Sequence, residues 1–312
     1  MVRRVARRAL VSLALPLLLG LALACSRSAP ASGKPILHIG STNFTEQQIL
    51  AELYGQALQA NGYTVERRTN LGPREIVEPA LESGQIDMYV DYLATLLAFL
   101  SPAATPGAAA SAAGDAASTA TALQQALQPR GITALDYAPA VDTNGLVVTR
   151  ATADKYHLAK TSDLAPVAGQ LVLGGPPECP QRPYCLPGLR DTYGIVFKDF
   201  KPLDAGGPLT VAALQAGEVD VAVLFTTDAA IAAREFVLLA DDKHLQAADN
   251  IVPLVRDEWL TRAPADFKTV VNGVSAQITT DALTSLNKQV GIDRKEPRDV
   301  AAAWLKEKGL MQ

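Results

Sequence analysis

The chain reads Ala80-Leu-Glu-Ser-Gly-Gln-Ile-Asp87 in one half and Ala213-Leu-Gln-Ala-Gly-Glu-Val-Asp220 in the other. In both copies a helical stretch ends at Gly and an acidic residue begins a strand. The same strand–loop–helix–strand order precedes each copy, from Ile36 and from Leu171, which argues against a chance match between two common turns. Alternating strands and helices predict an α/β fold. The repeat therefore predicts two α/β lobes joined by crossing segments, with a ligand cleft between them beyond the carboxyl ends of the strands.

The repeat also pairs two aromatic residues. Counting on from Gly84 and Gly217, Tyr92 in the first copy corresponds to Phe225 in the second. Two aromatic rings just beyond equivalent strand ends are expected to face one another across the cleft. Such rings attract a cation by about 2 kcal/mol once it is desolvated. The alternative is that both are ordinary core residues, the commoner fate of a single aromatic side chain.

The N-terminal segment is first positively charged and then apolar. Four arginines lie within the first eight residues, and residues 9–24 form an almost unbroken apolar run that ends in small residues. This order predicts a secretory signal peptide over residues 1–24. The run is short for a membrane span and is interrupted by Pro16, and an uncleaved N-terminal anchor is the alternative.

The residues that follow predict a lipid anchor. Leu21-Ala-Leu-Ala-Cys25 resembles the lipobox of bacterial lipoproteins, with Ala22 at the position where Leu is usual. The resemblance implies cleavage before Cys25 and acylation of this new N-terminal cysteine. Residues 25–33, rich in Ser, Ala, Gly and Pro, then form a flexible tether. We expect an exported lipoprotein, periplasmic or on the outer surface, that is held at the cell membrane.

Charge and motif content exclude several classes of function. With 28 basic and 32 acidic residues the net charge is −4, and no basic run follows the N-terminal segment, so nucleic acid is not an expected partner. The histidines, His38, His157 and His244, are scattered without metal-ligand spacing, and no nucleophile elbow or phosphate-binding Gly loop is present. We expect neither an enzyme nor a bound metal or cofactor. An enzyme built on the same two-lobed fold is the alternative, and turnover of a bound ligand would reveal it.

Two cysteines remain once Cys25 is assigned to the anchor. Cys179 and Cys185 lie in the loop Glu178-Cys-Pro-Gln-Arg-Pro-Tyr-Cys-Leu186. In an exported protein such a close pair predicts a disulfide. A metal site is the competing interpretation, but it needs further ligands, and no His or other Cys lies nearby.

Local signals predict several elements. Thr45-Glu-Gln-Gln48 has the form of a capping box, with Thr45 as the N-cap of a helix. Residues 101–121 are almost wholly Ala, Ser, Thr, Gly and Pro, which favours a mobile surface insertion or the edge of a helix, with helical residues from 123 to 127. The turn-forming residues 142–145 are expected to precede a strand at 146–148.

Several motifs together resemble one family. Gly40-Ser-Thr-Asn-Phe-Thr-Glu-Gln47, Asn70-Leu-Gly-Pro-Arg74 and Gly84-Gln-Ile-Asp-Met-Tyr-Val-Asp-Tyr92 are similar to stretches of the osmoprotectant-binding proteins of glycine betaine, carnitine and choline ABC importers. Leu186-Pro-Gly-Leu189 and Asn250-Ile-Val-Pro-Leu-Val-Arg256 agree, as do further stretches between them. No single motif is very specific, but their order and spacing are, and the resemblance spans Ile36 to Leu310.

The resemblance implies a type II periplasmic-binding-protein fold with two lobes. Lobe one comprises residues 34–141 and 251–312, and lobe two comprises residues 142–250. In this family a small osmolyte closes the lobes about a hinge, and the closed form docks on an ABC permease of the inner membrane. The protein is expected to act as a monomer. A sensory binding protein, or one that binds a small molecule other than a quaternary amine, is the alternative.

The resemblance also implies a set of ligand-binding residues. Tyr92 and Phe225 are expected to hold the cationic head of the ligand, while Arg182, with Thr95 and Thr42, holds its carboxylate. Positions at which many family members have Lys or an aromatic residue are Thr42, Asn144 and Val211, which reduces an aromatic box of four to about two. The complete predicted set is Thr42, Asn43, Tyr92, Thr95, Asn144, Arg182, Val211, Phe225 and Thr226.

Overall fold

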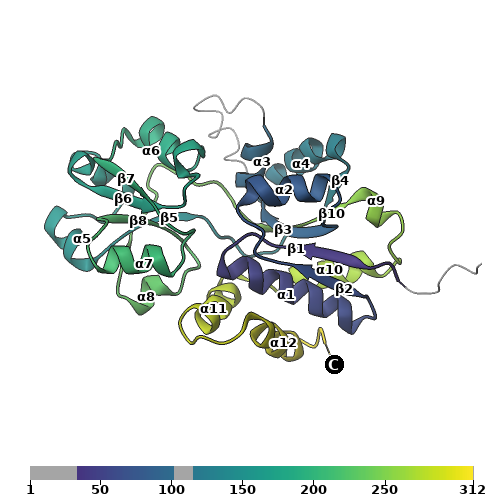
Figure 1. Cartoon of the computed structure of the whole chain (residues 1–312). Helices are drawn as coiled ribbons and strands as arrows, with labels where there is room; N and C mark the ends of the chain where they lie inside the picture. Colours follow the sequence, from purple (N-terminus) through teal and green to yellow (C-terminus); the bar gives the residue numbers. More distant parts are fainter. Residues whose placement is uncertain (1–33, 102–114, 312) are drawn as a thin grey trace, which may run out of the picture. The chain divides into compact units, whose positions relative to one another are not determined.

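The structure is a computed structural model that describes residues 34–101 and 115–311 (Figure 1). The predicted signal peptide, Cys25 and the tether lie outside the described residues. Residues 34–312 form one unit, which contains two five-stranded mixed sheets with helices around them. The prediction of an α/β fold with two lobes is confirmed.

The first sheet has the strand order β2-β1-β3-β10-β4. β1 runs parallel to β2 and β3, whereas β10 runs antiparallel to β3 and β4. Its strands are β1 (Leu37–Gly40), β2 (Val65–Arg68), β3 (Met88–Tyr92), β4 (Ile132–Ala134) and β10 (Ile251–Arg256). All of them fall within residues 34–141 and 251–312, which we call lobe one.

The second sheet repeats this plan, with the order β7-β6-β8-β5-β9. β6 runs parallel to β7 and β8, and β5 runs antiparallel to β8. Its strands are β5 (Asn144–Val148), β6 (Val172–Gly175), β7 (Asp199–Pro202), β8 (Val221–Phe225) and β9 (Val237–Leu238). They all fall within residues 142–250, which we call lobe two. The lobe boundaries themselves stay a prediction.

Helices cover both faces of each sheet (Figure 1). In lobe one, α2 and α3 lie on one side of the sheet and α1 and α10 on the other. The helices of lobe one are α1 (Thr45–Ala60), α2 (Arg74–Glu82), α3 (Leu93–Leu100), α4 (Ala116–Leu127), α9 (Asp257–Leu260), α10 (Phe267–Ser275), α11 (Thr280–Gly291) and α12 (Pro297–Glu307). Those of lobe two are α5 (Arg150–Tyr156), α6 (Leu186–Tyr193), α7 (Pro208–Gln215) and α8 (Ala230–Ala233).

The strands contribute side chains to a hydrophobic core on each face of the sheet, because successive side chains point to opposite sides. In β3, Met88 and Val90 pack into the core that also contains α1 and α10, whereas Tyr89 packs into the core beneath α2 and α3. In β8, Val223 and Leu224 divide in the same way between the two cores of lobe two. Strands buried on both faces explain the continuous apolar runs of the sequence.

The internal repeat is a structural repeat. Gly84 and Gly217 both adopt a left-handed conformation, with φ of +76° and +71°, at the ends of α2 and α7. The acidic residue that follows then performs the same task in each lobe. The Asp87 carboxylate accepts the backbone N–H of His38 at 2.9 Å, and the Asp220 carboxylate accepts that of Val172 at 2.8 Å. Each aspartate thus ties its strand to the neighbouring parallel strand.

Two crossing segments join the lobes. Val141 and Asn250 form an isolated antiparallel bridge, and the backbone N–H of Asp142 donates to the carbonyl of Asp249 at 3.2 Å. The predicted turn at residues 142–145 is therefore wrong: Asp142 belongs to a crossing segment, and Asn144 already begins β5. Pairing with the other crossing segment keeps this stretch extended despite its turn-forming residues.

One predicted helix start is also wrong. The N-cap of α1 is Phe44, without a side-chain cap, and Thr45 is the first helical residue. The Phe44 ring packs against Phe225, with 4.8 Å between ring centroids. The predicted helical residues 123–127 are confirmed as part of α4. This helix begins at Ala116, where the Asp115 side chain accepts the backbone N–H of Ser118, so the end of the Ala-rich stretch forms the edge of a helix.

Candidate ligand-binding site

A pocket of about 400 Å³, here called the cleft pocket, is lined by residues of both lobes. Its volume suits a small organic ligand. Lobe one supplies the loop after β1, the start of α2 and the end of β3, whereas lobe two supplies the start of β5, the disulfide loop and the end of β8. Seven of the nine predicted site residues line it: Thr42, Asn43, Tyr92, Thr95, Asn144, Arg182 and Phe225.

The other two predicted residues lie outside the cleft pocket. Val211, in α7, lines a neighbouring pocket. The Thr226 hydroxyl donates to Asp142 at 3.1 Å and accepts the backbone N–H of Thr143 at 3.0 Å. Thr226 therefore supports the crossing segment. Thr42 differs from it, since its buried hydroxyl has no hydrogen-bond partner among residues 34–101 and 115–311.

The cleft pocket has more aromatic residues than the two predicted for it. Phe44 contacts both predicted rings, with its ring centroid 6.4 Å from that of Tyr92 and 4.8 Å from that of Phe225. The lining also includes Phe99 and Tyr184. Phe44, Phe99 and Tyr184 come from the start of α1, from α3 and from the disulfide loop, and the family resemblance assigned a ligand contact to none of them. Together the five rings offer several π faces to a cation.

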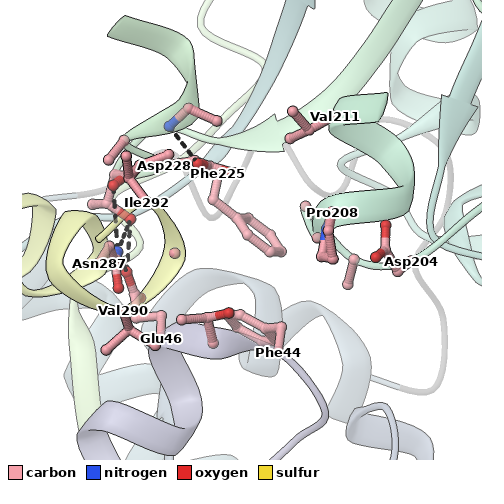
Figure 2. A pocket seen from close by; sticks show the side chains of 18 of the residues that line it. Phe44, Glu46, Asp204, Pro208, Val211, Phe225, Asp228, Asn287, Val290 and Ile292 are labelled. Carbon is pink, nitrogen blue, oxygen red and sulfur yellow. Dashed lines mark hydrogen bonds between the residues drawn. The ribbon is translucent and has the colours of Figure 1, made fainter. Parts of the chain in front are cut away.

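Gly206 allows Phe225 to reach the pocket. Gly206 has φ of +63°, and a Cβ atom placed there would lie 2.9 Å from the Phe225 ring. Both the conformation and the close approach require glycine. Figure 2 shows the Phe225 side chain extending toward Phe44.

These two rings also border a second pocket of about 450 Å³, here called the side pocket. Its lining includes the starts of α1 and α7 and the end of α11, and Figure 2 shows Asp204, Pro208 and Asn287 around it. The Asp204 carboxylate caps α7 by accepting the backbone N–H groups of Leu209 and Thr210 at 3.0 and 2.8 Å.

The floor of the cleft pocket contains a buried ion pair that the sequence analysis missed. The Arg74 guanidinium donates to both carboxylate oxygens of Asp91, at 2.8 and 2.5 Å, and to the hydroxyl of Thr95 at 2.7 Å. The Tyr89 hydroxyl donates to the same carboxylate at 2.8 Å. Burial acts to lower the pKa of Arg74, but the charge and hydrogen bonds of Asp91 outweigh it and raise that pKa.

Arg182, predicted to hold a ligand carboxylate, binds carboxylates of the protein. Its guanidinium donates to both oxygens of Glu75, at 3.1 and 2.9 Å, and lies 3.3 Å from Glu178. The Cys179–Cys185 disulfide encloses this loop, as predicted. Because Glu75 lies in the first turn of α2 in lobe one and Arg182 belongs to lobe two, their ion pair crosses the cleft.

A buried carboxylate beside the pocket joins three elements. Glu46, in α1, accepts hydrogen bonds of 2.6 Å from the Tyr92 hydroxyl, the Thr227 hydroxyl and the side-chain amide of Asn287. Burial raises the pKa of Glu46, although these three donors act to lower it. Figure 2 shows Glu46 beside Asn287, whose side-chain amide donates one of these bonds. Glu46 therefore fixes Tyr92 and links it to lobe two through Thr227.

Two more buried carboxylates line the cleft pocket. Asp249 accepts the backbone N–H groups of Ala94 and Thr95 at 2.8 and 3.1 Å, and burial raises its pKa to about 6. Burial and the charge of Glu46 raise the pKa of Asp142 well above its ordinary value. The pocket thus combines aromatic faces with an excess of carboxylates, which suits a ligand with a positively charged head.

Comparison with known proteins agrees with this arrangement. Residues 36–307 match the family described as the substrate binding domain of ABC-type glycine betaine transport systems. This chain belongs to that family. Its members supply the substrate-binding component of a transport system, which confirms the predicted family and the main functional interpretation.

Two curated relatives and one solved structure illustrate the family. The chain is 29% identical to the glycine-betaine-binding protein of Pseudomonas aeruginosa, over 95% of this chain and 96% of that one. It is 26% identical to the carnitine transport binding protein OpuCC of Listeria monocytogenes, over 88% of each. A crystal structure titled glycine betaine/carnitine/choline ABC transporter has a TM-score of 0.68 and 28% identity, over 88% of this chain and all of the other.

Among residues 34–101 and 115–311, no group of three or more His, Cys, Asp and Glu side chains is arranged to hold a metal ion. Within the same part of the chain, no helix has the length and apolar character needed to span a membrane.

Proposed function

We propose that this protein captures a small quaternary ammonium compound of the glycine betaine, carnitine and choline class in the cleft pocket and delivers it to an ABC permease. The observation that carries the proposal is the lining of this pocket, where five aromatic rings lie beside buried carboxylates. A quaternary ammonium group cannot donate hydrogen bonds, so aromatic faces and nearby negative charge are the means by which a protein recognises it. Family membership supports the same ligand class.

We assign roles to the predicted site residues on this basis. Tyr92 and Phe225 hold the cationic head, and Phe44 contacts both of their rings. Thr42 and Asn43 face the polar end of the ligand, and the Thr42 hydroxyl, which has no hydrogen-bond partner within the described part of the chain, supports this role. Thr95 and Asn144 act mainly by positioning. The Thr95 hydroxyl accepts from Arg74, while the Asn144 amide donates to the backbone carbonyl of Tyr184 at 3.2 Å.

Replacing Phe225 with alanine is expected to weaken binding of choline or glycine betaine about 30-fold, because a desolvated cation–π contact contributes about 2 kcal/mol. Phe225→Tyr should bind nearly as well as the original protein, since it keeps the ring. Isothermal titration calorimetry with choline, glycine betaine and carnitine measures both effects. Phe197→Ala is the matched control, because Phe197 packs against the core of lobe two and does not line the pocket. Equal affinities for Phe225→Ala and Phe197→Ala would contradict the assignment.

We further propose that the mature protein is a monomer held at the membrane by acylated Cys25, where it meets its permease. The charged segment, the apolar run and the lipobox-like residues before Cys25 support this anchor. Mass spectrometry of protein from its native membrane should find a diacylglyceryl group on Cys25, and Cys25→Ser should release the protein from the membrane fraction. A mature chain that begins elsewhere would refute the anchor without affecting the proposed ligand.

A further inference from the structure

The ion pair between Arg182 and Glu75 brings opposite charges from the two lobes together at the cleft pocket. Two groups of Arg182 share this carboxylate: Nη2 donates to both of its oxygens, and Nε lies 3.3 Å from one of them. Partial burial acts to raise the pKa of Glu75, but the hydrogen bonds and charge of Arg182 hold it below its ordinary value. Glu75 is therefore ionised at neutral pH and occupies the fork with which an arginine grips a carboxylate.

The other arginine of the pocket is occupied as well. Arg74 donates hydrogen bonds to both carboxylate oxygens of Asp91 and to the hydroxyl of Thr95. These N–H groups of Arg74 are therefore already bound to the protein itself. Among the residues that line the cleft pocket, Arg74 and Arg182 are the ones with cationic side chains. The carboxylates of the lining are more numerous: Glu75, Asp91, Asp142, Glu178 and Asp249. Even with Asp142 and Asp249 protonated, the lining keeps an excess of negative charge.

We infer that Glu75 determines the specificity of this site by taking the place of a ligand carboxylate at Arg182. The inference rests on the proposed function and narrows it to a quaternary ammonium cation without a carboxylate, such as choline. A zwitterion such as glycine betaine must either displace Glu75 from Arg182 or place its own carboxylate among those of the pocket. Like charges brought together in this way disfavour a ligand strongly.

Calorimetric titration of the purified protein with choline and with glycine betaine tests this inference. We expect the original protein to bind choline more tightly, by about tenfold, since a like charge in the pocket opposes betaine. Glu75→Gln removes one negative charge and leaves Arg182 with the single carboxylate of Glu178, so the affinity for betaine should rise and that for choline should fall. The ratio of the two dissociation constants should shift toward betaine by about tenfold or more. Adding Arg182→Gln to Glu75→Gln should abolish the gain for betaine.

Glu82→Gln is the matched control. Glu82 lies in the same helix as Glu75 but pairs with Arg130 away from the pocket, so its replacement should leave the ratio unchanged. If Glu75 only holds the lobes together, Glu75→Gln should weaken both ligands equally, and an unchanged ratio overturns the inference while the proposed function stands. Tighter binding of betaine than of choline by the original protein also overturns it. If neither compound binds, the proposed function fails, and the inference fails with it.

Discussion

Replacing Arg74 with alanine is expected to lower the free energy of unfolding by about 3–5 kcal/mol, the cost of removing one partner of a buried ion pair. The Asp91 side chain is buried, and Arg74 supplies two of its hydrogen bonds. Without Arg74 the Asp91 charge would lack a cation in the core between β3 and α2. The same change leaves the Thr95 hydroxyl without its donor and should disturb the floor of the cleft pocket.

Urea unfolding followed by circular dichroism measures this loss. Arg130→Ala is the control, because Arg130 pairs with Glu82 at the surface and an exposed ion pair contributes at most about 1 kcal/mol. The double variant Arg74→Met, Asp91→Leu should recover part of the stability, since apolar residues can replace a buried pair at little cost. A loss below that of Arg130→Ala would show that Asp91 does not depend on Arg74.

The Arg74–Asp91 pair illustrates what the sequence could reveal about the site. Asp91 interrupts the apolar run Met-Tyr-Val-Asp-Tyr, and a charged residue in a strand buried on both faces needs a partner. Strand alternation places Asp91 on the face of Tyr89, toward α2, and Arg74 begins that helix. The sequence therefore indicated that Asp91 is buried and needs a partner. It did not indicate which basic side chain forms the ion pair with Asp91.

The repeat predicted the two-lobed plan because it records local chemistry: a helix end at a left-handed glycine and an aspartate that ties two strands together. Contacts between the lobes join residues far apart in the chain and produce no local sequence motif. Phe44 contacts Phe225, and Glu75 reaches Arg182, only because two separate lobes come together. The sequence therefore predicted seven of the residues that line the pocket, but not which of the lining residues already bind one another.

Glu46→Ala is expected to weaken ligand binding by about ten- to a hundredfold, because a hydrogen bond to a charged group contributes about 1.5–3 kcal/mol. Glu46 holds the Tyr92 ring of the pocket by its hydroxyl, and through Thr227 it bonds lobe one to lobe two. Loss of this carboxylate frees Tyr92 and removes one bond that favours the arrangement in which both lobes line the pocket. Stability should change less than affinity, since burial disfavours the Glu46 charge and its removal relieves that cost.

Glu52→Ala and Glu46→Gln separate the role of Glu46 from a general effect on α1. Glu52 lies in the same helix and binds Gln56 and Arg67 without lining the cleft pocket, so its loss should leave affinity unchanged. Glu46→Gln keeps an acceptor for the Tyr92 hydroxyl but places an amide near that of Asn287, and its affinity should fall between those of the original protein and Glu46→Ala. Calorimetry and thermal unfolding of the three variants distinguish affinity from stability. If Glu46→Ala lowers the melting temperature but binds choline as tightly as Glu52→Ala does, Glu46 supports the fold without positioning Tyr92 for the ligand.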